Sequence, residues 1–209
     1  MPTLRPITSR AELQAYHRFR YSIYANSVQR GFLAGPEGVD MDVYDANALH
    51  LGWYEGDSLV GCVRLLRPIH SADPLHFFKD LLDGAMRRRA HALLAEAQAA
   101  GRPFCEVSRL CLAPEVRSLA MTRRLVLEII ATAHRYGMDH CLFTCDAPHA
   151  PFWQRIGFHA VDGFTGYARP RSSRPGWLLR GSYAELLALH RAELRRIGLA
   201  PLLPTVLAA

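Results

Sequence analysis

The sequence predicts a mixed α/β fold, in which helices flank a central, twisted, mixed sheet. Three observations support this prediction. Segments with helical and with strand-like hydrophobic periodicity alternate along the chain. Glu55-Gly56-Asp57 separates two strand-like segments and indicates an antiparallel hairpin. In the second half strands alternate with helices, which is typical of parallel pairing.

The first half is predicted to contain one helix followed by the hairpin. Ser9 to Glu12 form a capping box, and apolar residues at helical spacing continue from there to Tyr24. The hairpin strands are expected over residues 48–54 and 58–66, because both segments are rich in apolar and aromatic residues.

The second half is predicted to alternate between helices and strands. The boundaries follow from hydrophobic periodicity and from glycines that end helices. Helices are expected over 85–100, 118–136 and 151–156, and strands over 104–112, over 141–145 and from about Phe158. A capping box at Ser182 opens a last helix, expected to end near Ile197.

No repeat, linker or low-complexity segment interrupts this pattern. We therefore expect one domain over residues 1–209, which ends in a C-terminal helix and an apolar tail at about 182–209. The tail is too short to cross a membrane and is expected to pack on the body or to fray.

The composition excludes disordered and fibrous proteins, since 50% of the residues are hydrophobic and 21% are charged. There is no signal peptide and no apolar run long enough to span a bilayer, so we expect a cytoplasmic protein. The five cysteines form no C-x-x-C pair and are expected to be buried and reduced. Without paired histidine spacings either, we expect no metal site.

Charge is distributed unevenly around a net value of +6. Residues 31–63 contain six acidic residues and no lysine or arginine, whereas residues 163–184 contain four arginines and no acidic residue. This asymmetry suggests two surfaces with different roles, one of them for an anionic partner. Arginines that only keep the protein in solution are the alternative.

Two motifs in the second half resemble the GNAT superfamily of N-acyltransferases. They are the strand Glu106-Val-Ser-Arg-Leu-Cys-Leu112 followed by a long helix, and Phe152-Trp-Gln-Arg-Ile-Gly157-Phe158. The resemblance implies a GNAT-like fold with a splayed strand pair, in which the pantetheine arm of a thioester lies in the gap between the strands. It also implies residues that bind this arm or the acyl chain: Leu110, Cys111, Leu112, Arg117 and Phe152.

Four motifs, taken together, resemble the acyl-homoserine-lactone synthases and the long-chain N-acyl amino acid synthases. In order they are Arg20-Tyr-Ser-Ile-Tyr24, Asp40-Met-Asp42-Val-Tyr44-Asp45, Arg64-Leu-Leu and Glu106-Val-Ser-Arg109. The resemblance covers about residues 15–160. Asp40 replaces the glutamate usual in lactone synthases, and Gln29-Arg-Gly-Phe32 replaces their Arg-Leu-Gly-Trp. Together with Ala48-Leu-His50-Leu, these departures favour the amino acid branch, although S-adenosylmethionine remains the alternative acceptor.

The resemblance implies a role for each charged position. Glu106 and Ser108 lie on one strand face and are the candidate catalytic residues, Glu106 as the base that takes the amine proton. A solvated strand carboxylate is the alternative for Glu106. Arg109 faces the other side unless a bulge intervenes. The remaining charged residues have two possible roles: they bind the acceptor, or they pair with one another and form a rigid wall of the site. These residues are Arg20, Asp40, Asp42, Asp45, Arg64 and Arg109.

The donor is predicted from the loop before the long helix. A loop that binds coenzyme A offers glycines whose N–H groups cradle the pyrophosphate, but here Arg117-Ser-Leu-Ala120-Met-Thr122 has none. This favours an acyl carrier protein, which is acidic and has a single phosphodiester on its pantetheine arm. The surfaces that would attract it are Arg87–Arg89, Arg117, Arg123, Arg124 and residues 169–180.

The resulting expectation is an enzyme without a bound cofactor. It would transfer a fatty acyl chain from acyl carrier protein to the amine of an amino acid or its derivative. The alternatives are a lactone synthase that uses S-adenosylmethionine, an acetyltransferase that depends on coenzyme A, and a non-catalytic acyl-binding protein. A nucleic-acid-binding module is disfavoured, because no helix-turn-helix or zinc spacing is present.

Overall fold

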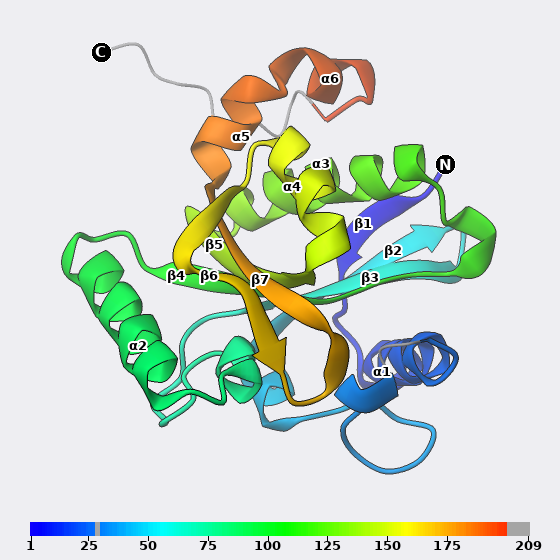
Figure 1. The fold of residues 1–209 in the computed structure, drawn as a ribbon. Coiled ribbons are helices and arrows are strands. Elements are labelled where there is room, and N and C mark those ends of the chain that lie inside the picture. The colour runs from blue at the N-terminus through cyan, green and yellow to red at the C-terminus, as the bar shows by residue number, and fades with distance from the viewer. Residues whose placement is uncertain (28–29, 200–209) are drawn as a thin grey trace.

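The computed structural model describes residues 1–27 and 30–199, which form one seven-stranded sheet (Figure 1). The sheet order is β1-β2-β3-β4-β5-β7-β6. Every neighbouring pair is antiparallel except β4 and β5, which are parallel. The strands are β1 (Thr3–Pro6), β2 (Ala48–Glu55), β3 (Ser58–Leu66), β4 (Phe104–Leu112), β5 (His140–Asp146), β6 (His159–Arg169) and β7 (Ser172–Ser182).

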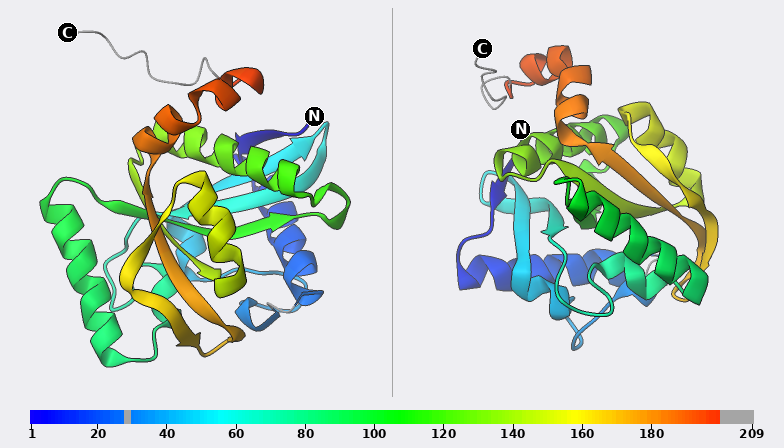
Figure 2. Two further views of the ribbon diagram at one scale, coloured as in Figure 1. Left: turned by 45° about the horizontal axis from the view of Figure 1, so that its top comes forward. Right: turned by 90° about the vertical axis from the view of Figure 1, so that its left-hand side faces the viewer.

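Helices cover both faces of this sheet (Figure 2). On one face lie α1 (Arg10–Ala25), α2 (Gly84–Ala99) and the short 3-10 helices η1 (Arg30–Phe32), η2 (Val43–Asn47) and η3 (His76–Asp80). On the other lie α3 (Leu119–Arg135), α4 (Ala150–Ile156), α5 (Tyr183–Leu189) and α6 (Arg191–Arg196). Two further 3-10 turns, η4 (Pro114–Val116) and η5 (Ala147–His149), precede α3 and α4.

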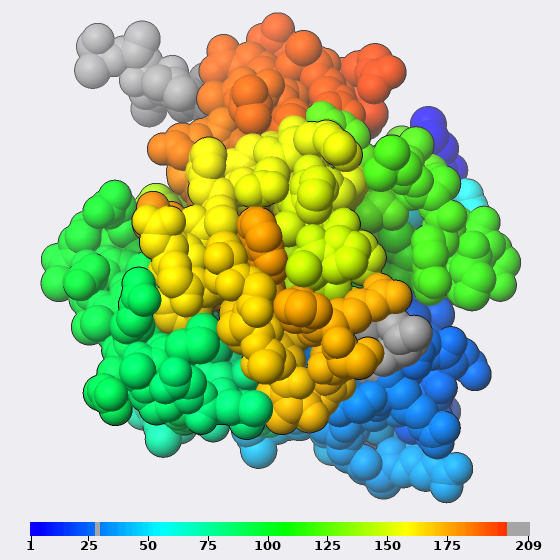
Figure 3. Space-filling view, viewed as in Figure 1, coloured from blue at the N-terminus to red at the C-terminus, as the bar shows by residue number. Residues whose placement is uncertain are grey.

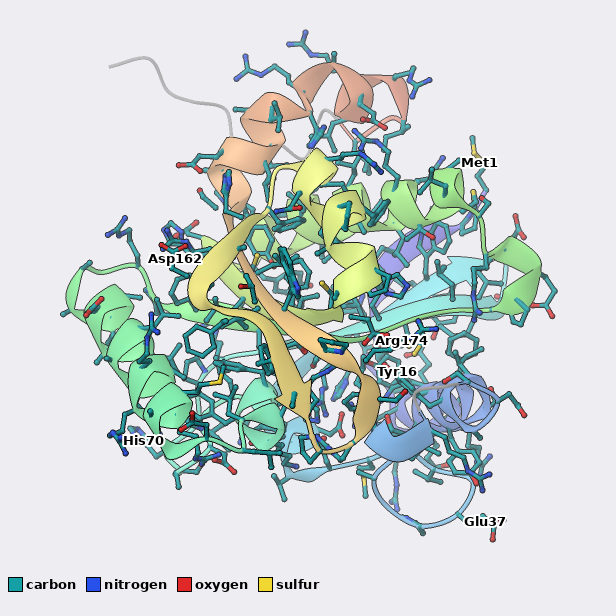
Figure 4. The ribbon with its side chains drawn as sticks, viewed as in Figure 1. Met1, Tyr16, Glu37, His70, Asp162 and Arg174 are labelled. Atoms are coloured by element: carbon teal, nitrogen blue, oxygen red, sulfur yellow. The ribbon has the colours of Figure 1, made fainter. Side chains whose placement is uncertain are left out.

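Each helical layer has its own hydrophobic core. The largest core joins α3, α4, α5 and α6 to the sheet and includes Leu125, Ile129 and Phe143. On the opposite face one cluster packs α2 and η3 on the sheet, and a smaller one packs α1 on it. Figure 4 labels Tyr16, an α1 residue of the smaller cluster, whose buried hydroxyl donates to the Val63 carbonyl at 3.0 Å.

Most predicted elements are confirmed. The Ser9 capping box, the β2–β3 hairpin and β4 lie where the sequence places them, and all five cysteines are buried. The prediction missed β1 and β7. β1 has only four residues, and Pro175-Gly176 interrupts the apolar alternation of β7. The predicted last helix is broken at His190 into α5 and α6.

The predicted splay between β4 and β5 is confirmed. The two strands pair only at Phe104–His140, Cys105–Cys141 and Glu106–Leu142, and no pairing between them continues beyond Glu106 within the described chain. A bulge accompanies this divergence on the other side of β4. Between the paired positions Ser108 and Cys111, β4 has two residues, Arg109 and Leu110, opposite the single residue Val63 of β3, and Arg109 takes a φ of 55°.

No helix in the described part of the chain is long and apolar enough to cross a membrane. The apolar tail after Leu199, which we expected to pack or fray, lies outside the described residues, as does Gln29 of the Gln29-Arg-Gly-Phe32 motif.

Candidate active site

The splay between β4 and β5 opens into a cavity of about 270 Å³ that reaches both faces of the sheet. Its half on the α1 side is polar, and its half on the α3 side is apolar. The polar half is lined by Tyr24, Phe32, His76, Asp80, Glu106, Ser108, Arg109, Thr144, Asp146 and Arg169. The apolar half is lined by Val107, Leu110, Val126, Ile129, Ile130, Phe143, Cys145, Trp153, Phe158 and Tyr183, and His149 also lines the cavity.

Glu106 lies where the two halves meet, at the last β4–β5 pair. Its side chain is 1% exposed, and its Oε2 accepts a hydrogen bond from the Phe77 amide at 3.3 Å. Burial raises the pKa of Glu106 to about 8, although the charge of Arg64 opposes this rise. A carboxyl group with that pKa can exchange a proton near neutral pH, as general acid–base catalysis requires. Glu106 is therefore not the solvated strand carboxylate of the alternative interpretation.

Ser108 lies beside Glu106 on the same strand face, as predicted. Its Oγ accepts a hydrogen bond from Arg64 Nε at 3.1 Å. Within residues 1–27 and 30–199 no histidine or carboxylate is bonded to this hydroxyl, so no described side chain would activate it as a nucleophile. The geometry suits Ser108 to donating or accepting a hydrogen bond instead.

The six charged residues of the predicted network lie together behind the polar half. Arg20 pairs with Asp40 and with Asp45, each at 2.7 Å. Arg64 pairs with Asp42 at 2.7 Å and with Asp45 at 3.0 Å. Arg109 Nε donates to Asp40 Oδ2 at 2.8 Å. Arg20 and Arg64 each contact two aspartates. Asp40 and Asp45 each contact two arginines, so the six residues form one continuous network.

Burial decides between the two interpretations of this network. The Arg20 and Asp40 side chains are both 0% exposed, so neither is accessible to an acceptor molecule. Burial alone would raise the pKa of Asp45, but the nearby His17, the hydrogen bond from Arg20 and the Arg64 charge hold it well below its usual range. Asp45 therefore stays ionised, and all three aspartates are paired with arginines. This geometry favours the rigid wall over direct acceptor binding.

Arg109 joins this wall to the cavity. Because of the bulge, its side chain points to the same face as Glu106 rather than to the opposite face. Its Nη2 donates to the Phe32 carbonyl at 2.8 Å, and its Nη1 lies 3.4 Å from His76 Nε2. Burial, together with the Arg109 charge, lowers the pKa of His76 well below its usual value, so His76 is neutral.

The sequence prediction missed several polar residues of the cavity. Asp146, at the end of β5, forms a buried ion pair with Arg169 of β6. Asp80, in η3, accepts from Arg171 at 3.3 Å, and burial raises the pKa of this carboxyl. Asp146 had one sequence signal, because an acidic residue directly after an apolar strand sits at the strand end where ligands bind in open sheets.

Only one of the five predicted acyl-binding or pantetheine-binding residues, Leu110, lines the cavity. The bulge shifts the alternation of β4 by one residue, so Cys111 turns toward α1 and packs with Tyr16 and Tyr24. Cys111 therefore lies outside the cavity lining. Leu112 belongs to the core under α3 and is also outside the lining.

The remaining two predicted residues lie near the cavity but outside its lining. Arg117 donates to the Leu112 carbonyl at 2.9 Å and so holds the turn before α3. Phe152 packs against Trp153, which lines the cavity in its place. Phe77 and Phe78 belong to the core on the α2 side.

Many arginines of the predicted carrier-binding surfaces have partners within the chain. Arg87 pairs with Asp73, Arg123 with Glu193 and Arg124 with Glu128. Figure 3 shows α2 and the β6–β7 hairpin side by side on one face of the molecule, where Arg89 donates to the Asp162 carbonyl. These contacts reduce the charge available to an outside partner.

His17, Asp45 and His50 form the one group of possible metal ligands found among the described residues, with ligand atoms within 4.8 Å of one another. However, Asp45 already accepts hydrogen bonds from Arg20, and Arg64 lies 3.0 Å from it. Two guanidinium groups beside the carboxylate oppose a cation there. The donor set does not fit a metal well.

A family model, N-acyl amino acid synthase FeeM, matches residues 15–180, which contain the whole charged network, β4 and β5. The chain belongs to this family of N-acyl amino acid synthases. Members of the family are acyltransferases, and this protein is therefore an enzyme of that class. The resemblance stated from the motifs is confirmed.

Solved structures agree with this assignment at the level of the fold. FeeM, an N-acyl amino acid synthase from uncultured soil microbes, superposes with a TM-score of 0.62 at 16% identity, covering 92% of this chain and 97% of that one. The acyl-homoserine-lactone synthase LasI gives 0.63 at 13% identity, with coverages of 88% and 90%. BjaI, a lactone synthase that depends on coenzyme A, superposes with a TM-score of 0.63 at 17% identity, covering 92% of this chain and 89% of that one. No curated protein sequence matches this chain.

Proposed function

We propose that this acyltransferase moves a fatty acyl chain from the thioester of an acyl carrier protein to the amine of an amino acid or an amino-acid derivative, in the cytoplasm. The observation that carries the proposal is the cavity that crosses the sheet at the splay. One half is apolar enough to hold an alkyl chain, and the other half offers charged groups for an amine acceptor.

In this proposal the acyl chain occupies the apolar half between α3, α4 and β5. Val126, Ile129 and Ile130 line it from α3, and Phe143 and Trp153 line it from β5 and α4. Burial of each methylene there contributes about 0.8 kcal/mol to binding. The thioester carbonyl then lies near Glu106, where β4 and β5 separate and the β4 peptide groups no longer pair with β5. Such peptide N–H groups can stabilise the oxyanion that forms on this carbonyl.

The reaction needs an uncharged amine. The ionised Glu106 takes one proton from the acceptor's ammonium group, directly or through a water molecule, and the nitrogen lone pair then attacks the thioester carbon. A C–N bond forms and the C–S bond breaks. The pantetheine thiol leaves with a proton, and the product is an amide. Ser108 supplies a hydrogen bond beside Glu106.

The network of ion pairs is proposed to position other residues of the site and to take no part in the chemical step. It fixes Arg109 and, through Arg109, the loop at Phe32 that borders the polar half. Leu110 contributes to the acyl site. Arg117 is proposed to act near the pantetheine arm, since it holds the turn at the N-terminus of α3.

A lactone synthase that uses S-adenosylmethionine is the second candidate, because the two lactone synthases compared above superpose as well as FeeM does. Acyl-coenzyme A is the alternative to acyl carrier protein as the donor, because the lactone synthase BjaI depends on coenzyme A. Both alternatives are decided in the same experiment.

The test is turnover. The protein is incubated with long-chain acyl carrier protein and, separately, with the corresponding acyl-coenzyme A. Each donor is offered a pool of amino acids or S-adenosylmethionine, and products are followed by mass spectrometry. N-acyl amino acids from the carrier protein are expected. An acyl-homoserine lactone would establish the second candidate, and turnover with acyl-coenzyme A but not with the carrier protein would contradict the proposed donor.

A further inference from the structure

The inner end of the apolar half is formed by one aromatic residue, Tyr183. Its side chain is 0% exposed, and it lines the cavity. The Tyr183 hydroxyl lies 3.6 Å from Cys105 Sγ. Cys105 and Cys141 face each other where β4 and β5 still pair, and neither lines the cavity. Tyr183 therefore separates the cavity from the closed part of the strand pair.

The backbone around Tyr183 holds the ring in this place. Its amide donates to the Asp139 carbonyl at 2.9 Å, and the Ser182 hydroxyl caps α5 by accepting from the Glu185 amide at 3.4 Å. Burial raises the pKa of Tyr183 well above its usual value, so the phenol stays neutral. With its hydroxyl directed to the cysteines, Tyr183 presents the apolar ring to the cavity.

The position of Tyr183 limits the depth of the apolar half. Along β5 the apolar half is lined by Cys145, near the open end, and by Phe143, whereas Cys141 lies outside the lining on the closed side of Tyr183. Cys145 and Phe143 are two positions apart, which corresponds to about 7 Å at 3.3 Å per residue. A longer chain would have to displace a buried, packed aromatic ring.

We propose that Tyr183 is the floor of the acyl site and sets the longest acyl chain that the enzyme accepts. This inference rests on the proposed function, because it takes the apolar half to be the acyl site. On this proposal one aromatic ring limits the acyl length, and a substitution that removes the ring should remove the limit.

Binding of unreactive analogues tests the floor separately from catalysis. S-alkyl pantetheine thioethers, each two carbons longer than the last, are titrated against the protein by calorimetry. For the wild type, affinity is expected to rise about fourfold per methylene until the chain reaches Tyr183, and then to stop rising. In Tyr183→Leu the rise should continue to longer chains. In Tyr183→Phe, which keeps the ring, the stopping point should not move.

Phe78→Leu is the matched control, because Phe78 is equally buried but lies in the core on the α2 side. It should lower the melting temperature and leave the stopping point unchanged. Melting temperatures of all variants establish that each is folded at the assay temperature. An unchanged stopping point in Tyr183→Leu, or a shift in Phe78→Leu, would overturn the floor.

The same titrations separate this inference from the proposed function. If affinity does not rise with chain length in the wild type, both the floor and the acyl site are overturned. If the length limit follows Tyr183 but no amide forms with any donor, the floor is supported and the proposed reaction fails.

Discussion

Arg109 and Asp40 form a buried ion pair, with Arg109 Nε 2.8 Å from Asp40 Oδ2, although an unbroken β4 would turn the arginine to the other face of the sheet. The contact exists because Arg109 adopts a φ of 55°, which is uncommon for a residue with a side chain. The bulge thus places Glu106 and Arg109 on one face. It also turns Leu110 toward the apolar half and Cys111 away from it.

Asp40 is expected to be essential for stability. Asp40→Asn removes the charge that Arg20 and Arg109 share, and it leaves two buried guanidinium groups underpaired. Breaking a buried pair in this way costs about 3–5 kcal/mol in unfolding free energy. Urea denaturation measures the loss.

Glu37→Gln is the control for Asp40→Asn, because Glu37 belongs to the same acidic segment but points away from the protein (Figure 4). Its effect on unfolding free energy should stay within about 0.5 kcal/mol. Equal effects of the two substitutions would show that the network does not stabilise the fold.

Glu106→Gln is expected to lower turnover at least a hundredfold while the protein stays folded, since a general base contributes about 10²–10⁴. The amide oxygen of glutamine can still accept the Phe77 N–H bond. In the wild type, turnover should rise as pH increases toward about 8, where Glu106 ionises, and then level off. The measurement is kcat against pH for both proteins. A variant with wild-type kcat, or one with the same rise below pH 8, would exclude Glu106 as the base.

Glu106 also predicts how stability depends on pH. Its folded pKa, about 8, lies above the ordinary value of 4.5, so between these values the folded state keeps a proton that the unfolded state releases. The wild type therefore loses unfolding free energy relative to Glu106→Gln as pH rises from about 4.5 to about 8. The difference should approach the order of 4 kcal/mol at the upper end. Parallel unfolding curves at pH 5, 6.5 and 8 measure it, and a difference that shrinks with pH would show that Glu106 is not buried as a neutral acid.

The hairpin, the helix caps and the order of β4, α3 and β5 could be predicted because each depends on local signals, such as Ser9 or Glu55-Gly56-Asp57. The members of the charged network could be named from motifs. Their pairing could not, because Arg20, Asp42 and Arg64 come from different elements that meet only in the folded sheet.

The bulge is the main feature that the sequence concealed. Nothing between Glu106 and Leu112 favours a left-handed residue, since the segment has no glycine or asparagine. Tertiary contacts of the Arg109 side chain hold the conformation instead. That one residue changes which side chains of β4 face the cavity, so that Leu110 lines it and Cys111 does not.

Ser108→Ala is expected to lower kcat about tenfold, less than Glu106→Gln does. The hydroxyl accepts from Arg64 Nε but has no bonded base among the described side chains, so its loss removes one hydrogen bond worth about 1.4 kcal/mol. Steady-state kinetics with saturating acceptor measures the effect. A loss as large as that of Glu106→Gln would instead indicate a covalent or proton-transfer role for Ser108.

Docking of a carrier protein is expected to depend on Arg88 more than on its neighbours. Arg87 is paired with Asp73, and Arg89 is bonded to the Asp162 carbonyl, whereas Arg88 is exposed on α2. Arg88→Glu should raise KM for acyl carrier protein severalfold at low salt and progressively less as salt is added, because screening weakens attraction between exposed charges. Arg196→Glu is the control, since this arginine is also exposed but lies on α6, on the opposite face of the sheet. If KM rises equally in both variants, or if salt leaves the wild-type KM unchanged, α2 does not receive the carrier.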